Sequence, residues 1–166
     1  MNVTDKLESQ GLLDLGMFLA TSWSMTTSTE RPTQVRDLMT KEVITVEHNE
    51  KLLKADDVMR LGRIRHVPVV DGDGLLTGIV SQRDLFHSGL LKALGYGSHG
   101  QRQALDMILI KEAMRSEVVT TTPDTTLAAA ARLMLEKKIG CLVVVEERKI
   151  VGILAESDFV KLHASD

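Results

Sequence analysis

The chain contains one sequence pattern twice, and this internal repeat constrains the fold more than any single motif does. Residues 38–85 align with residues 113–159, so that Met39 matches Met114 at an offset of 75 residues. The offset falls to 74 beyond residues 71–74, where the second copy is one residue shorter. A length change at a loop tip leaves the flanking elements in register. Two copies of about fifty residues predict one pseudo-symmetric module.

Composition excludes several classes of protein. The net charge is −3 and basic residues alternate with acidic ones, so a nucleic-acid partner is not expected. The single cysteine, Cys141, lies in an apolar run and is compatible with a reducing cytoplasm. Nothing approaches the ~20 apolar residues of a membrane span, and Asp14 interrupts the apolar segment 11–20, which argues against an export signal. We expect a soluble, cytoplasmic protein without a membrane partner.

The hydrophobic and turn patterns predict an α/β (α+β) fold with four regions. Each repeat is expected to fold as β-α-β-β-α, and the two repeats to be related by a pseudo-twofold axis. The predicted regions are residues 1–34, an N-terminal helix (4–20) and a Ser/Thr-rich linker; 35–88, the first repeat; 89–109, a helical insertion; and 110–166, the second repeat.

Within the repeats, the expected elements follow from apolar periodicity and turn residues. A strand at Val43–Val46 precedes a helix that is capped by Asn49 and has an apolar face from Leu52 to Leu61. The predicted hairpin strands are His66–Val70 with Leu75–Val80, and Cys141–Val145 with Ile150–Leu154. The insertion is expected to extend a helix from Ser81, form a flexible loop at Gly95–Gly100, and continue as a helix over Gln101–Ile110.

Both repeats end in a glycine, an apolar strand, a polar turn and an aspartate, as GIVSQRD (78–84) and GILAESD (152–158). A strand that ends at a helix N-terminus can hold an anion such as phosphate, and an adjacent carboxylate can accept hydrogen bonds from the vicinal hydroxyls of ribose. Ser81 and Asp84 also fit a capping box without a ligand. The second copy retains Asp158 although Ala155 offers no capping hydroxyl, which favours a ligand role without deciding between the two interpretations.

The doubled pattern resembles a pair of CBS domains, the module that is named after cystathionine β-synthase and is also called a Bateman module. The resemblance covers residues 35–163 and depends on the DLM and EAM openers, the VITV and VVTT segments, RHVPVVD, and the two closing motifs. It implies two clefts between the repeats that receive adenosine-containing ligands: AMP, ADP, ATP or S-adenosylmethionine.

The resemblance also implies which residues bind the ligand. One site would use Ser81 and Asp84 with Ile44 and Thr45, and the other Asp158 with Val119 and Thr120. Arg65 and His66 are candidates for contact with phosphate, although they could instead be a solvated strand end. Arg83 of the closing motif belongs to the same expected set. Ala155 removes a phosphate ligand from the second site, so the sites are expected to be unequal.

The remaining polar residues predict no enzyme. The five histidines lack metal-ligand spacing, and neither a G-x-S-x-G elbow nor a P-loop is present. We therefore expect a regulatory module whose ligand shifts its conformation and acts on a separate enzyme or transporter, or through a homodimer. The face formed by Leu127, Ala130, Ala131 and Met134 would suit contact between copies. A scaffold that keeps the fold without binding a ligand is the alternative.

Overall fold

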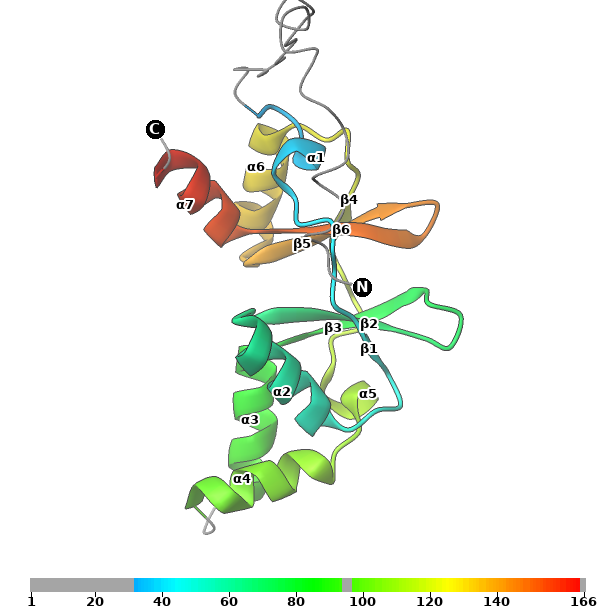
Figure 1. Cartoon of the computed structure of the whole chain (residues 1–166), viewed down its shortest axis with the longest axis vertical. Coiled ribbons are helices and arrows are strands. Elements are labelled where there is room, and N and C mark those ends of the chain that lie inside the picture. Colours follow the sequence, from blue (N-terminus) through cyan, green and yellow to red (C-terminus); the bar gives the residue numbers. More distant parts are fainter. Residues whose placement is uncertain (1–31, 94–96, 165–166) are drawn as a thin grey trace, which may run out of the picture. The chain divides into compact units, whose positions relative to one another are not determined.

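The computed structural model describes residues 32–93 and 97–164 (Figure 1). The described residues all belong to one compact unit, Pro32–Asp166. The predicted N-terminal helix (4–20), most of the predicted linker, and Gly95 with Tyr96 lie outside these residues. No helix within the described part of the chain is long and apolar enough to cross a membrane.

Two three-stranded sheets carry the two repeats and have the same topology, in which the first strand is parallel and the third antiparallel to the central one. Both hairpins have a register shift at the equivalent place, between Val69 and Val70 and between Val144 and Val145. The strands are β1 (Val46–Glu47), β2 (His66–Val70), β3 (Leu76–Ser81), β4 (Thr120–Thr121), β5 (Cys141–Glu146) and β6 (Lys149–Ala155). The mixed α/β class and the duplicated architecture that the sequence predicts are confirmed.

Seven helices lie among the described residues: α1 (Val35–Leu38), α2 (Leu52–Gly62), α3 (Gln82–Ala93), α4 (Gly97–Asp106), α5 (Ile110–Ala113), α6 (Leu127–Lys137) and α7 (Glu156–Ala164). Helices α2 and α6 follow the first strand of their repeats, and α3 and α7 follow the last. Helix α4 belongs to the first repeat alone and packs against α3 and α2 (Figure 1).

Each repeat has its own hydrophobic core, and each core contains the opening helix of the other repeat. Ile110 of α5 is fully buried with the first sheet, α2 and α4, whereas Val35 of α1 is fully buried with the second sheet and α6. Fully burying a side chain of this size contributes about 1.5–3 kcal/mol. The repeats are therefore joined by an exchange of segments. Core members include Leu52, Ala55, Val67, Val80 and Leu105 in the first repeat, and Leu127, Ala130, Leu142, Val144 and Leu154 in the second.

Backbone hydrogen bonds continue this exchange beyond the opening helices. The Thr40 N–H donates to the Ile153 carbonyl over 2.9 Å, and the Ile153 N–H donates back over 3.0 Å. Arg115 and Ile79 form the same pair, with distances of 2.9 Å and 3.0 Å. The segment that opens each repeat thus runs beside the last strand of the other repeat.

The start of the first repeat differs from the sequence prediction. Only Val46 of the predicted strand Val43–Val46 is in β1. The N-cap of α2 is Lys51, not Asn49, whose Oδ1 instead accepts a hydrogen bond from Lys111 Nζ at 3.0 Å. The Asn49 side chain therefore contacts the opening helix α5 of the second repeat rather than the first turn of α2.

The exposure of individual side chains differs from the sequence prediction in two helices, α2 and α6. Leu61 is 80% exposed because it lies near the C-terminus of α2, beyond the last buried residue of that helix. Leu127, Ala130 and Met134 of α6 are buried in their own repeat, so they cannot form the contact between copies that the sequence suggested. The alanine run 128–131 of α6 also allowed tight packing within the repeat, and the structure shows this role.

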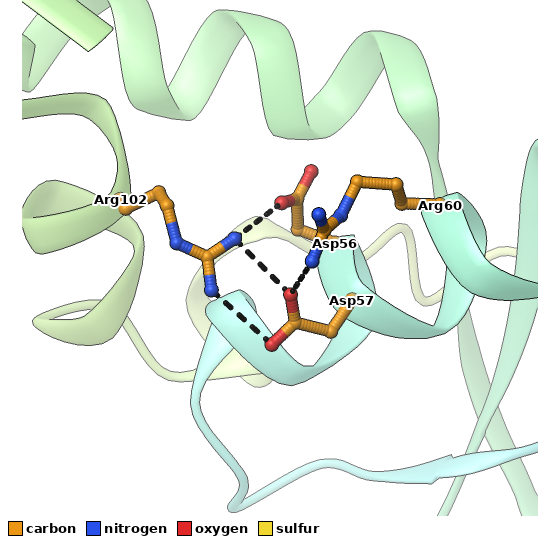
Figure 2. A network of polar contacts seen from close by, with 4 residues as sticks. All are labelled: Asp56, Asp57, Arg60 and Arg102. Carbon is orange, nitrogen blue, oxygen red and sulfur yellow. Dashed lines mark hydrogen bonds and ion pairs between the residues drawn. The ribbon is translucent and has the colours of Figure 1, made fainter. Parts of the chain in front are cut away.

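The insertion also differs from its prediction. Helix α4 begins at Gly97, so residues 97–100 are helical rather than loop. It ends at Asp106, and a separate short helix, α5, begins at Ile110. Arg102 of α4 contacts both Asp56 and Asp57 of α2, and Arg60 also contacts Asp57 (Figure 2). This ion-pair network holds α4 against α2.

Candidate functional site

A cavity of about 640 Å³ lies between the two repeats. Its volume is within the usual range for small-molecule sites. The first repeat contributes the start of β2 and the closing motif, and the second contributes its opening segment, the end of α6 and the start of β5. The lining residues are Arg65, His66, Ile79, Ser81, Gln82, Arg83, Asp84, Phe86, Arg115, Glu117, Val118, Val119, Lys138, Ile139, Gly140, Cys141 and Glu156.

Asp84 is positioned by the end of β3 and the first turn of α3. Its Oδ2 accepts hydrogen bonds from the Ser81 N–H at 2.8 Å and from the Ser81 hydroxyl. The Asp84 N–H donates in return to Ser81 Oγ at 3.3 Å. The capping box that the sequence allowed is thus formed, and it fixes the carboxylate at the wall of the cavity with its side chain only 12% exposed.

The other oxygen of Asp84 is held by the opposite repeat. Arg115 donates to Asp84 Oδ1 from Nε at 3.3 Å and from Nη2 at 3.2 Å. Arg115 is not among the site residues that the sequence pattern predicts. Arg115 directly follows the EAM opener, but the equivalent residue of the first repeat is Thr40. A comparison of the two copies therefore does not single out Arg115.

His66 lies at the start of β2, partly buried in the cavity lining. Burial lowers the pKa of its imidazole, and the charge of Arg65 lowers it further, whereas Asp84 and Glu156 act in the opposite direction. A Cβ placed on Gly140 would lie 3.2 Å from His66 Cε1, so the second repeat approaches this ring closely. The ring therefore lies where the two repeats meet.

Cys141 occupies the position in the second repeat that matches His66. Burial raises the pKa of its thiol to about 12, with a smaller contribution from the charge of Glu156. A thiol with so high a pKa is a poor nucleophile at neutral pH. The expectation that Cys141 is a core residue agrees with this environment.

The structure brings some of the expected site residues together in one cavity and leaves others outside it. The cavity that contains Ser81 and Asp84 is lined by Val118 and Val119 of the second repeat, not by Ile44 and Thr45. The Arg115–Ile79 bridge explains this, because it brings the second opening segment beside the first closing motif. The cavity also contains Arg65, His66 and Arg83.

The remaining expected residues lie elsewhere in the fold. Ile44 is 50% exposed and its Cδ1 lies 3.8 Å from the place of a Cβ on Gly62 of α2, and neither Ile44 nor Thr45 lines the cavity. Thr120 is in β4, where it pairs with Val143, and it does not line the cavity. These three residues are therefore not part of the cavity that contains Asp84.

Asp158 mirrors Asp84 in part. It is buried, with Oδ2 accepting from the Ala155 N–H at 2.9 Å and Oδ1 within 3.2 Å of Lys161 Nζ. Ala155 supplies no hydroxyl, and Thr40 stands where the other half has Arg115. Ala155 predicts that the two sites are unequal, and Thr40 in place of Arg115 is a second difference between them.

The cavity carries charges of both signs. Its cationic side chains are Arg65, Arg83, Arg115 and Lys138, and its carboxylates are Asp84, Glu117 and Glu156. Lys138 caps the C-terminus of α6 with a left-handed backbone, φ 54°, as Arg63 does for α2 with φ 51°. Among the residues that the structure describes, no three His, Cys, Asp or Glu side chains are grouped so that they could hold a metal ion.

With this geometry established, comparison with known families identifies the class. The family model for the CBS domain matches residues 35–90 and 110–165, and the chain belongs to that family as a tandem pair. The CBS domain-containing protein YhcV of Bacillus subtilis is 32% identical over 124 residues, 75% of this chain and 81% of YhcV. Homoserine O-acetyltransferase of Methanococcoides burtonii is 30% identical over 78% of this chain, which spans only 24% of that protein.

Solved structures give the same fold. An acetoin utilization protein (AcuB) from Vibrio cholerae is 36% identical and superposes with a TM-score of 0.65 over 81% of this chain and 92% of its own. The CBS pair of MJ0100, solved with 5-methylthioadenosine and S-adenosyl-L-methionine, is 28% identical, with a TM-score of 0.65 and coverage of 81% and 98%. CBSX2, solved with AMP, is 26% identical, with a TM-score of 0.64 and coverage of 80% and 96%.

Proposed function

We propose that the chain is a regulatory module that binds an adenosine-containing ligand in the cavity between its repeats. The observation that carries the proposal is the meeting of Ser81 and Asp84 with Val118 and Val119 in one cavity of ligand size. In this proposal the Asp84 carboxylate receives the ribose hydroxyls. The relatives solved with AMP and with S-adenosyl-L-methionine support the class of ligand.

The rest of the cavity suits the other parts of such a ligand. Ile79, Val118 and Ile139 provide apolar surface for an adenine ring. Arg65 and Arg83 are exposed cations at the same cavity and can contact phosphate. The ligand would therefore contact both repeats at once, and it would favour whichever arrangement of the repeats binds it more tightly.

The proposal also includes a homodimer and a separate regulated partner. Phe86 of α3 and Val160 of α7 occupy equivalent positions in the two repeats and are 57% and 69% exposed. Because Phe86 also lines the cavity, these positions do not identify a dimer interface, and the homodimer stays a prediction. Sedimentation of a monomer at micromolar concentration would exclude this homodimer. A separate enzyme or transporter as the final target, a cytoplasmic location and the lack of an enzymatic activity all stay predictions.

Thermal unfolding with and without ligand tests the central proposal. A ligand at a hundred times its Kd stabilises the folded state by about 2.7 kcal/mol, which raises Tm by about 5–10 °C for a chain of this size. AMP, ATP, adenosine and S-adenosylmethionine are the probes. We expect at least one of them to raise the Tm of the wild type, and Asp84→Asn to lose that increase.

The matched control is Asp37→Asn. Asp37 caps α1 through the Gln34 N–H at 2.9 Å and the Thr33 N–H at 3.1 Å, and it does not line the cavity. This variant should keep the full ligand-induced increase in Tm even if its own Tm is lower. If no probe changes the Tm of the wild type, the ligand-free scaffold is the better description, since the structure already shows Asp84 capping α3.

A further inference from the structure

Arg115 is held at the edge of the cavity by its own backbone. Its N–H and carbonyl both pair with Ile79 of the other repeat, at 2.9 Å and 3.0 Å. Ile79 is two residues before Ser81, so the Arg115 side chain starts beside the closing motif of the first repeat. Its position therefore does not depend on the side-chain ion pair that it makes.

That ion pair occupies the carboxylate which the proposed function assigns to ribose. Arg115 holds Asp84 Oδ1, while Ser81 holds Oδ2. A vicinal diol that binds Asp84 must therefore take Oδ1 from the guanidinium. The Asp84 side chain is 12% exposed and that of Arg115 58% exposed, so the arginine has the greater freedom to move.

A displaced guanidinium needs a new anionic partner. The cavity already contains three other cationic side chains, Arg65, Arg83 and Lys138, against the carboxylates of Glu117 and Glu156. A ligand with phosphate supplies the missing charge and can accept two hydrogen bonds from one guanidinium. Neutral adenosine does not supply it, and S-adenosylmethionine has a sulfonium cation in the place of the phosphate, with its carboxylate only at the end of the methionine chain.

We infer that Arg115 makes this cavity selective for adenosine ligands that carry phosphate over those that are neutral or cationic there. The inference rests on the proposed function and names its substrate class. The selectivity belongs to the Asp84 half of the module alone. Thr40 makes the equivalent backbone pair with Ile153, but its short neutral side chain cannot replace the arginine.

Titration calorimetry with the whole chain tests the inference, with adenosine, AMP and S-adenosylmethionine as ligands. We expect the wild type to bind AMP at least about tenfold more tightly than adenosine, in line with one charge-assisted contact. Arg115→Gln should weaken AMP binding by about tenfold and leave adenosine unchanged or tighter, because Asp84 is then released. Arg115→Lys should keep part of the preference for AMP.

The control is Arg132→Gln on α6, which removes one positive charge outside the cavity lining and should leave both affinities unchanged. Equal weakening of adenosine and AMP by Arg115→Gln would overturn the inference, as would a wild type that binds adenosine or S-adenosylmethionine as tightly as AMP. The proposed function survives both of these results. A wild type that binds none of these three ligands and no ATP overturns the proposed function and the inference together.

Discussion

Gly78 of β3 lies directly against Met114, so that a Cβ on the glycine would be 2.5 Å from Met114 Sδ and 3.1 Å from the Arg115 carbonyl oxygen. Gly152 and Met39 repeat this contact in the second half, where the equivalent distances are 2.5 Å to Met39 Sδ and 3.3 Å to the Thr40 carbonyl. The methionine of each opener therefore packs on the glycine of the other repeat. This contact gives one physical reason why both sequence copies carry a methionine and a glycine at these positions.

Replacing Gly78 with alanine should destabilise the protein by about 1–3 kcal/mol, the usual cost of overpacking. The Met114 side chain can move away, but the backbone carbonyl of Arg115 cannot do so without weakening the Arg115–Ile79 pair. Urea unfolding measures the change. Gly72→Ala is the control, since a Cβ there would meet nothing within 4 Å. Equal stability of the two variants would contradict this account of the contact.

The attachment of α4 to α2 gives a second prediction. Arg102→Ala should speed amide hydrogen exchange in α4 while leaving the second repeat unaffected, because it removes the contacts with Asp56 and Asp57 (Figure 2). High salt should have a similar but weaker effect on the wild type, since these groups are partly exposed and screened. Arg132→Ala is the matched control. Faster exchange throughout the chain would mean that Arg102 stabilises the whole module instead.

Much of the fold could be predicted because the repeat supplies two versions of each element. Apolar runs and turn residues predict hairpins around residues 71–74 and 146–149, and the structure confirms both hairpins. The short helices α1 and α5 were missed, since four residues carry too little periodicity to be recognised. The exchange of Val35 and Ile110 between cores was also missed, because sequence order gives no information about which copy a short segment packs against.

The residues that line the cavity could be predicted from the sequence only in part. Ser81 and Asp84 were found from a local pattern that fixes their geometry within one turn. Their grouping with Ile44 assumed that each repeat completes its own site, whereas long-range bridges place Val119 there. Arg115 was missed because the comparison of copies emphasised shared residues, and a residue that differs between the copies gave no signal.

The burial of Cys141 gives a third prediction. A pKa of about 12 in place of 9.0 lowers the thiolate fraction at pH 8 by about a thousandfold. The native protein should therefore react with a disulfide reagent such as DTNB much more slowly than the protein in denaturant, because the greater nucleophilicity of a high-pKa thiolate offsets only part of this loss. The reaction in denaturant serves as the control for thiol content. Rapid reaction of the native protein would show that the start of β5 is accessible.

The last prediction concerns His66 and pH. Its pKa should lie below the usual 6.5 in an NMR titration of the folded protein, mainly because of burial and secondly because of Arg65. The unfolded chain then binds a proton near pH 6.5, whereas the folded chain does so only at lower pH. The free energy of unfolding should therefore fall as the pH decreases from 6.5 toward the pKa of the folded state, and the contribution of His66 should be fully present above 6.5.

Urea unfolding of the wild type and of His66→Gln, at intervals from pH 8 to pH 5, measures this dependence. The difference in unfolding free energy between the two proteins should be constant above about pH 7.5 and change in favour of the variant as the pH decreases. A difference that stays constant down to pH 5 would show that His66 is not buried as the structure describes. The sign of the change in this free-energy difference is informative as well, because Asp84 and Glu156 both favour the protonated His66 ring. A change in favour of the wild type at low pH would mean that these carboxylates outweigh burial.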